Sequence, residues 1–161
     1  MKMKNFKTMM VAVVALMIGV CSCGSDDDEP ELAVASQVAG SYTGEEILTV
    51  MGEPEQDTKT FVFTKSTDTS VDMTVPEYGE GMMAIPALTV KNITLTKSDK
   101  AITGRLASYE GTVTTSNGSE KAFTFSDVTV IFSDNKAVVT FTMKYGNMPF
   151  AFAGQFTGIK K

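Results

Sequence analysis

The chain has 161 residues, a length that suits one domain, and its 14 Lys and Arg against 19 Asp and Glu give a formal net charge of −5. An acidic chain is a poor partner for nucleic acid, whose phosphates require clusters of Lys and Arg. The sequence has no histidine and two cysteines, so the most common general base and metal ligand is absent.

The first 22 residues have the pattern of a secretory signal peptide. Lys2, Lys4 and Lys7 make a positive start, and residues 9–20 form an uncharged, almost wholly apolar run. A membrane span needs about 20 apolar residues, so this run is too short for one. The other alternative, a buried core helix, is disfavoured by the acidic stretch that follows at once. We expect this segment to be removed on export.

The residues after the apolar run resemble a lipobox, the signal for lipid attachment and cleavage before a cysteine. Val20 and Ser22 stand in the aliphatic and small positions before Cys23. Cys21 fits the acceptor position poorly, because it would have Val20 where a small residue is needed. A disulfide within this Cys-x-Cys pair would be strained, and no further cysteine completes a metal site. The resemblance implies a lipid on Cys23 and a mature charge of −8, because the three leading lysines are lost.

A short acidic stretch follows the cysteine. Residues 24–31 lack any large apolar side chain, so we expect a solvated tether within residues 23–37. The stretch resembles the surface-export signal of Bacteroidetes-type lipoproteins, which is carried here by Ser25, Asp26, Asp27, Asp28 and Glu29. A Ca²⁺ site built from the aspartates is a weaker alternative, because no folded loop arranges them. Residues 30–38 then predict one short helix or an extended lead into the domain.

From Ser41 onward the pattern is that of β-strands, because short runs rich in Thr, Val, Ile, Phe and Tyr alternate with turn residues. Eight strands are predicted, and the fifth of them either bends at Glu110 and Gly111 or splits in two. Their expected ranges are 42–51, 58–66, 70–75, 87–97, 101–115, 121–133, 136–145 and 148–158. Changes of phase predict bulges near Lys91 and Asn92 and between Phe125 and Val128. Hairpin turns are expected at 116–118, 133–135 and 146–147.

The fold class expected from this pattern is all-β, an antiparallel meander that closes into a barrel of roughly eight strands. Closure would remove exposed strand edges, whereas a two-sheet sandwich would show the same alternation of apolar and polar residues. The expected interior is rich in phenylalanine. It comprises Phe61, Phe63, Val71, Met73, Phe123, Phe125, Phe141, Phe150 and Phe152.

Three short segments resemble the calycin-like (lipocalin-like) β-barrel domain of Bacteroidetes-type lipoproteins: residues 38–44, 85–95 and 152–158. This resemblance implies a secreted eight-stranded barrel over residues 38–161, anchored by its lipid in the outer membrane at the cell surface. Gly40 and Tyr42 stand where true lipocalins carry Gly and Trp, which implies that Tyr42 plugs one barrel end with Arg105 stacked on it. The alternative is that Tyr42 is an ordinary core aromatic.

The carboxylates offer little sign of catalysis. Glu45 and Glu46 are adjacent on a strand and must face opposite sides, and the other acidic clusters lie in expected loops. We therefore interpret the charges as a solvated rim and expect neither an enzyme nor a cofactor or metal site.

Two binding functions remain. One is a carrier of a small apolar ligand in the barrel mouth, and the other is a filled barrel whose loops bind a protein or glycan. Two loops with apolar tips serve either function. The candidate contacts are Tyr78, Met82, Met83, Tyr145, Met148 and Phe150.

Overall fold

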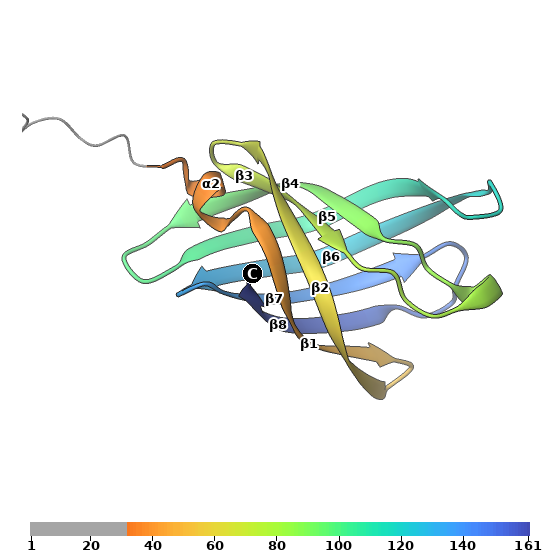
Figure 1. Ribbon diagram of the computed structural model, residues 1–161. Coiled ribbons are helices and arrows are strands. Elements are labelled where there is room, and N and C mark those ends of the chain that lie inside the picture. The colour runs from red at the N-terminus through yellow and green to blue at the C-terminus, as the bar shows by residue number, and fades with distance from the viewer. Residues whose placement is uncertain (1–31) are drawn as a thin grey trace, which may run out of the picture. The chain divides into compact units, whose positions relative to one another are not determined.

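The computed structural model describes residues 32–161. It contains a short helix, eight strands and a 3₁₀ turn (Figure 1). In chain order these are α2 (Val34–Val38), β1 (Gly40–Val50), β2 (Glu53–Thr67), β3 (Ser70–Val75), η1 (Gly81–Met83), β4 (Leu88–Lys97), β5 (Ile102–Thr114), β6 (Glu120–Ser133), β7 (Lys136–Tyr145) and β8 (Phe152–Lys160).

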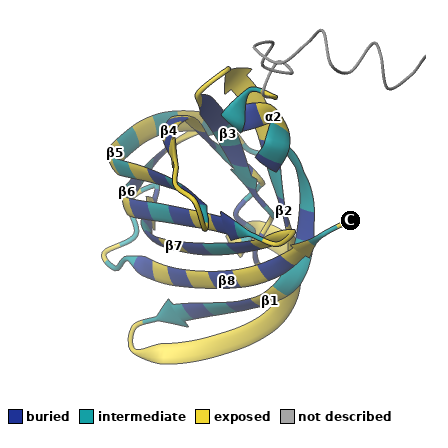
Figure 2. Cartoon of the chain, turned by 90° about the vertical axis from the view of Figure 1, so that its left-hand side faces the viewer, coloured by how far each residue is buried: buried dark blue, intermediate teal, exposed yellow. Residues whose placement is uncertain are grey.

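The strands form a closed antiparallel barrel in which each pairs with its neighbours in sequence and β8 returns to pair with β1. Closure decides between the barrel and the sandwich, which the alternating pattern could not separate. Buried and exposed residues alternate along the strands (Figure 2), most regularly along β7, where every second side chain points into the core.

Aromatic side chains fill the centre of the barrel. Phe61 stacks on Phe156 with ring centroids 4.1 Å apart, and Phe141 lies between Phe61 and Phe125 at 6.2 and 5.3 Å. Eight of the nine residues expected in the interior are buried, and Phe150 is partly buried against the same cluster. The axis of the barrel is therefore packed with side chains.

The predicted irregularities are found at the expected places. The pairing of β3 with β4 shifts register at Asn92, and that of β6 with β7 shifts at Asp127, both of which have positive φ angles. Asp134 and Asn135, between β6 and β7, also have positive φ, as a type I′ hairpin turn requires. The fifth strand is one continuous strand rather than two, because Glu110 and Gly111 keep continuous register with β6.

Three boundaries differ from the expectation by more than two residues. Strand β2 begins at Glu53 rather than at residue 58, because residues 53–57, whose acids were expected in a loop, pair with β1. The last strand begins at Phe152 rather than at residue 148, because residues 146–151 form the turn from β7. The helix covers only Val34–Val38. It buries Ala35 and Val38, whereas Leu32, which precedes it, is exposed. Within residues 32–161, no helix combines the length and apolar character needed to cross a membrane.

Helix α2 closes one end of the barrel. The backbone N–H of Ala35 donates to the carbonyl of Asp68 in the β2–β3 turn, and the Lys160 ammonium donates to the carbonyl of Gln37. Four connections lie at the opposite end, which we call the loop end: β1–β2, β3–β4, β5–β6 and β7–β8 (Figure 1).

Candidate binding site

The barrel wall is incompletely paired toward the loop end. Strand β4 pairs with β5 over four residue pairs only, from Thr94 with Arg105 to Lys97 with Ile102. Residues 88–93 of β4 and 106–114 of β5 therefore have no strand partner on the sides that face each other. Because β5 continues in register with β6 as far as Thr114, it stays extended beside this opening.

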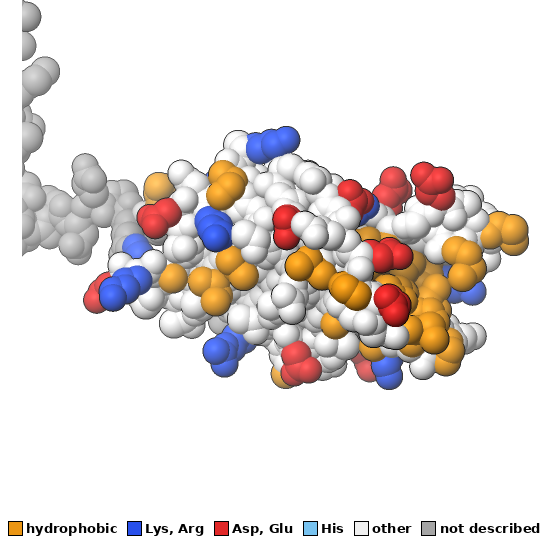
Figure 3. All heavy atoms as spheres, turned by 90° about the horizontal axis from the view of Figure 1, so that it is seen from below, with side chains coloured by type: hydrophobic (Ala, Val, Ile, Leu, Met, Phe, Trp, Pro, Cys, Tyr) orange, Lys and Arg blue, Asp and Glu red, His pale blue; other side chains and the backbone are white. Residues whose placement is uncertain are grey.

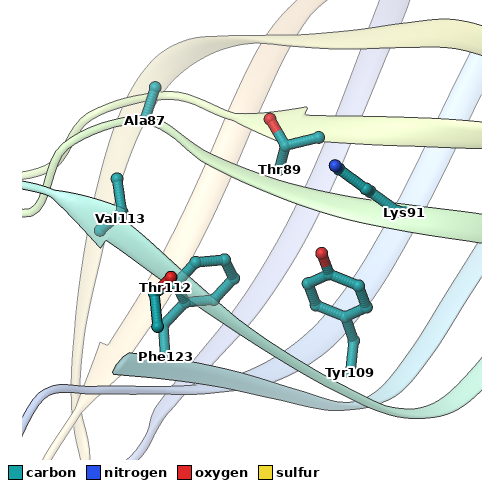
Figure 4. A pocket seen from close by; sticks show the side chains of 7 residues that line it. All are labelled: Ala87, Thr89, Lys91, Tyr109, Thr112, Val113 and Phe123. Carbon is teal, nitrogen blue, oxygen red and sulfur yellow. The ribbon is translucent and has the colours of Figure 1, made fainter. Parts of the chain in front are cut away.

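A pocket of about 340 Å³ lies in this opening and reaches the surface. Tyr109, Val113 and Phe123 line it from the apolar side of β5 and β6, and Thr89 and Lys91 line it from β4 (Figure 4). Ala87 and Thr112 complete the lining. The Tyr109 hydroxyl points from β5 toward β4, and its ring lies 6.0 Å from that of Phe123. The pocket thus combines an aromatic floor with a polar rim that contains one cation.

The β3–β4 loop covers the loop end of the barrel. Tyr78 and Ile85 exchange backbone hydrogen bonds of 2.9 and 2.8 Å, and both side chains are buried. The Tyr78 hydroxyl donates a 2.7 Å hydrogen bond to Oε1 of Glu46, which points into the barrel from β1 and is 2% exposed. Loop and wall are therefore joined by a polar contact within an otherwise apolar interior.

This contact has a distinctive electrostatic setting. Burial raises the pKa of Glu46 to about 7, against the lowering effects of the Tyr78 hydrogen bond and of Lys59. The Lys59 ammonium lies 5.8 Å from the centre of the Tyr78 ring and pairs with Asp57 at 2.9 Å. Burial and the adjacent Glu46 carboxylate raise the pKa of Tyr78, so its hydroxyl remains a donor.

The residues predicted as mouth contacts do not form one site. Met82 and Met83 lie fully exposed at the tip of the β3–β4 loop, whereas Tyr78 is buried beneath it. Met148 and Phe150 are half-buried against the core in the β7–β8 loop. Tyr145 is also buried, and its hydroxyl has no hydrogen-bond partner among the described residues.

Tyr42 lies at the α2 end of the barrel. Its ring is buried against Phe63 and Phe132, and its hydroxyl donates to the carbonyl of Val38 at 2.9 Å. The cation near this ring is Lys160, with Nζ 6.0 Å from the ring centre. Arg105, the expected stacking partner, is exposed on β5.

The interpretation of all acidic residues as a solvated rim is wrong for Glu46. The sequence did contain a signal, because adjacent acids on a strand that lines a core place one of them inside. The lateral pocket had no such signal, since it depends on where the pairing of β4 with β5 ends. Among the described residues, no cluster of three Asp, Glu, His or Cys side chains suits a metal ion.

Other predicted sites lie outside the described residues. These are Cys23 and the residues of the expected surface-export signal, Ser25, Asp26, Asp27, Asp28 and Glu29.

Comparison with known proteins agrees with the fold. A crystal structure of "a putative outer membrane protein" from Bacteroides fragilis NCTC 9343 superposes with a TM-score of 0.58 at 21% identity, covering 80% of this chain and 53% of that one. This chain thus spans about half of that neighbour's length. Curated proteins give no match. The model of the family described as "Calycin-like beta-barrel domain" matches residues 38–159, and the chain therefore belongs to that family.

Proposed function

We propose that this protein is a non-enzymatic binding module of the outer membrane that holds a small, largely apolar ligand in the pocket between β4 and β5. The observation that carries the proposal is the pocket itself, about 340 Å³ with Tyr109 and Phe123 in its lining. Its volume falls within the range of small-molecule sites, which combine apolar walls with a few polar groups.

The lining favours a particular kind of ligand. Tyr109, Val113 and Phe123 offer contact to an apolar ring or chain, and the hydroxyl of Thr89 and the ammonium of Lys91 can meet an acceptor or an acid. The packed aromatic centre leaves the axis as a poor alternative site. A lateral site also avoids displacing Tyr78, which covers the loop end.

A binding role suits the chemistry of the chain. The sequence has no histidine, and the buried carboxyl group of Glu46 does not line the pocket. General acid–base catalysis needs a titratable group within reach of the bound molecule, and this lining contains two such side chains, Lys91 and Tyr109, without a carboxylate.

Placement at the outer membrane is supported by two observations. The start of the chain resembles a lipoprotein signal with the lipid on Cys23, and the acidic run from Ser25 to Glu29 resembles a surface-export signal. The structural neighbour from Bacteroides fragilis is described as "a putative outer membrane protein".

Thermal denaturation with a panel of small aromatic and aliphatic compounds tests the site. A ligand at about 100 times its Kd should stabilise the protein by about 2.7 kcal/mol. The stabilisation should vanish in Val113→Asp, which places a charge in the pocket, and persist in the double variant Met82→Asp, Met83→Asp. If the ligand-induced stabilisation is lost in the methionine variant alone, the site lies at the loop end. If no compound in the panel shifts the melting temperature, the proposal is overturned.

A second candidate is a display module that binds a protein or glycan through its loop end. Hydrophobic side chains gather at that end of the molecule, with acidic residues beside them (Figure 3). Met51, Met82 and Met83 are 76, 103 and 73% exposed there. Exposed apolar surface of this kind marks interaction sites, and methionine adapts to varied partners. Cross-linking from position 82 on intact cells would detect such a partner.

A further inference from the structure

The strand edges at the lateral opening carry backbone hydrogen-bonding groups that a small molecule would leave unpaired. Residues 106–114 of β5 and 88–93 of β4 are extended strand edges that face each other without pairing. Alternate residues of each edge direct a backbone N–H and a carbonyl into the opening. The group that satisfies such a row of donors and acceptors is another extended polypeptide backbone.

The β5 edge lacks the usual protection against strand pairing. Residues 106–114 contain no proline and no lysine, Glu110 is their single charged residue, and their pairing with β6 continues without a register shift. A second free edge, residues 53–61 of β2, lies where the pairing of β2 with β3 stops at Val62. That edge carries Pro54 and three acids, Glu53, Glu55 and Asp57, which oppose pairing. The β5 edge is therefore the better template.

The pocket would select among the side chains of an added strand. Side chains on one face of a strand recur at every second residue, so Tyr109 and Val113 lie on one face of β5, and the register partner of Tyr109 is the buried Phe125. An apolar side chain of the added strand would enter this pocket. Lys91 is the charged residue in the lining and forms no ion pair with any described residue, so it favours a carboxylate on the partner.

We propose that the occupant of the opening is an extended, acidic segment of a partner protein, which adds to β5 as an extra strand. An apolar side chain of the segment fills the pocket and a carboxylate faces Lys91. This inference rests on the proposed function, because the apolar group that the pocket holds is here a side chain of the added segment rather than a separate small molecule.

A labelled model peptide tests the inference. The probe is a short peptide with blocked ends, valine at every second position and one glutamate between two of the valines. Its binding to the full chain is followed by fluorescence anisotropy. We expect saturable binding that is lost when alternate backbone nitrogens on one edge are methylated. Binding should protect the amides of residues 106–114 from hydrogen exchange. Equal binding by the methylated peptide, or protection at residues 53–61 instead, would overturn strand addition at β5.

Charge is tested separately. Lys91→Glu should weaken binding of the acidic probe several-fold, while Lys136→Glu, an exposed lysine on β7, should leave it unchanged. Equal losses in both variants would show a general charge effect and contradict the assigned role of Lys91. If the peptide fails to bind while a small compound still shifts the melting temperature through Val113, the strand proposal fails and the proposed function stands. Failure of both probes overturns both.

Discussion

At the scale of single residues, Glu46 is the buried ionisable group that joins the β3–β4 loop to the barrel wall. An ionisable carboxyl group that is 2% exposed pays a large desolvation cost when charged, and one hydrogen bond from Tyr78 offsets only part of it. The pKa of about 7 expresses that balance. The contact joins residues 32 positions apart and fixes the β3–β4 loop to β1.

This balance predicts how stability depends on pH. The folded-state pKa of Glu46, about 7, exceeds its ordinary value of 4.5, so the folded protein binds more protons between these values than the unfolded chain. Stability should therefore fall as pH rises from about 4.5 to 7, by at most about 3 kcal/mol from this group. Glu46→Gln should remove that slope and raise stability at pH 8, as measured by urea unfolding. Glu45→Gln, at the exposed neighbour, is the control. An unchanged slope in Glu46→Gln would assign the pH dependence to other groups.

At the scale of elements, β7 and β8 show how the packed core constrains the strands. Gly154 on β8 lies opposite Phe141 on β7, and a methyl group added to Gly154 would overlap the Phe141 ring. Gly154→Ala should therefore destabilise the barrel by about 1–3 kcal/mol through overpacking. Calorimetry of Gly154→Ala with Phe141→Leu should show a loss smaller than the sum of the two single losses. Strict additivity would mean that the ring does not occupy that space.

The elements also show how far the sequence alone can predict this structure. Strand positions followed from alternation, and the turn at Asp134 and Asn135 from residues that tolerate positive φ, because both signals are local. The phase changes at Asn92 and Asp127 predicted real bulges for the same reason. The opening beside β5 could not be predicted, because it depends on the register between strands. The burial of Tyr78 depends likewise on a partner far along the chain.

Helix α2 is an element with a measurable share in stability. It buries Ala35 and Val38, and it supplies the carbonyl that accepts from Tyr42. A chain that begins at Ala39 should be less stable than one that begins at Leu32 by about 3 kcal/mol, from the lost burial and hydrogen bonds. Urea unfolding of the two chains measures this difference. Equal stabilities would show that the barrel end needs no cover.

At the scale of the whole molecule, the chain begins with a positive start, a short apolar run and Val20-Cys21-Ser22-Cys23. These features predict processing at Cys23. Cys23→Ala should remain an unprocessed precursor without lipid, while Cys21→Ala should be processed normally. Metabolic labelling with a fatty acid measures both. Label retained by Cys23→Ala would overturn the assignment.

A prediction on the placement of the whole molecule concerns the acidic run behind Cys23. Residues 26–29 are four consecutive acids, and no large apolar residue near them could hold them in a core. If they form the export signal, protease added to intact cells should cleave the wild-type protein but spare a variant with alanine at all four positions. A variant with the four acids moved behind Leu32 keeps the charge and composition, and it should also be spared if position relative to Cys23 matters. Immunoblots after protease treatment, with and without cell lysis, give the readout. Equal cleavage of all three proteins in intact cells would reduce the acidic run to a spacer. If the wild type and the moved variant are cleaved while the alanine variant is spared, the net charge of the run, and not its position, is the signal.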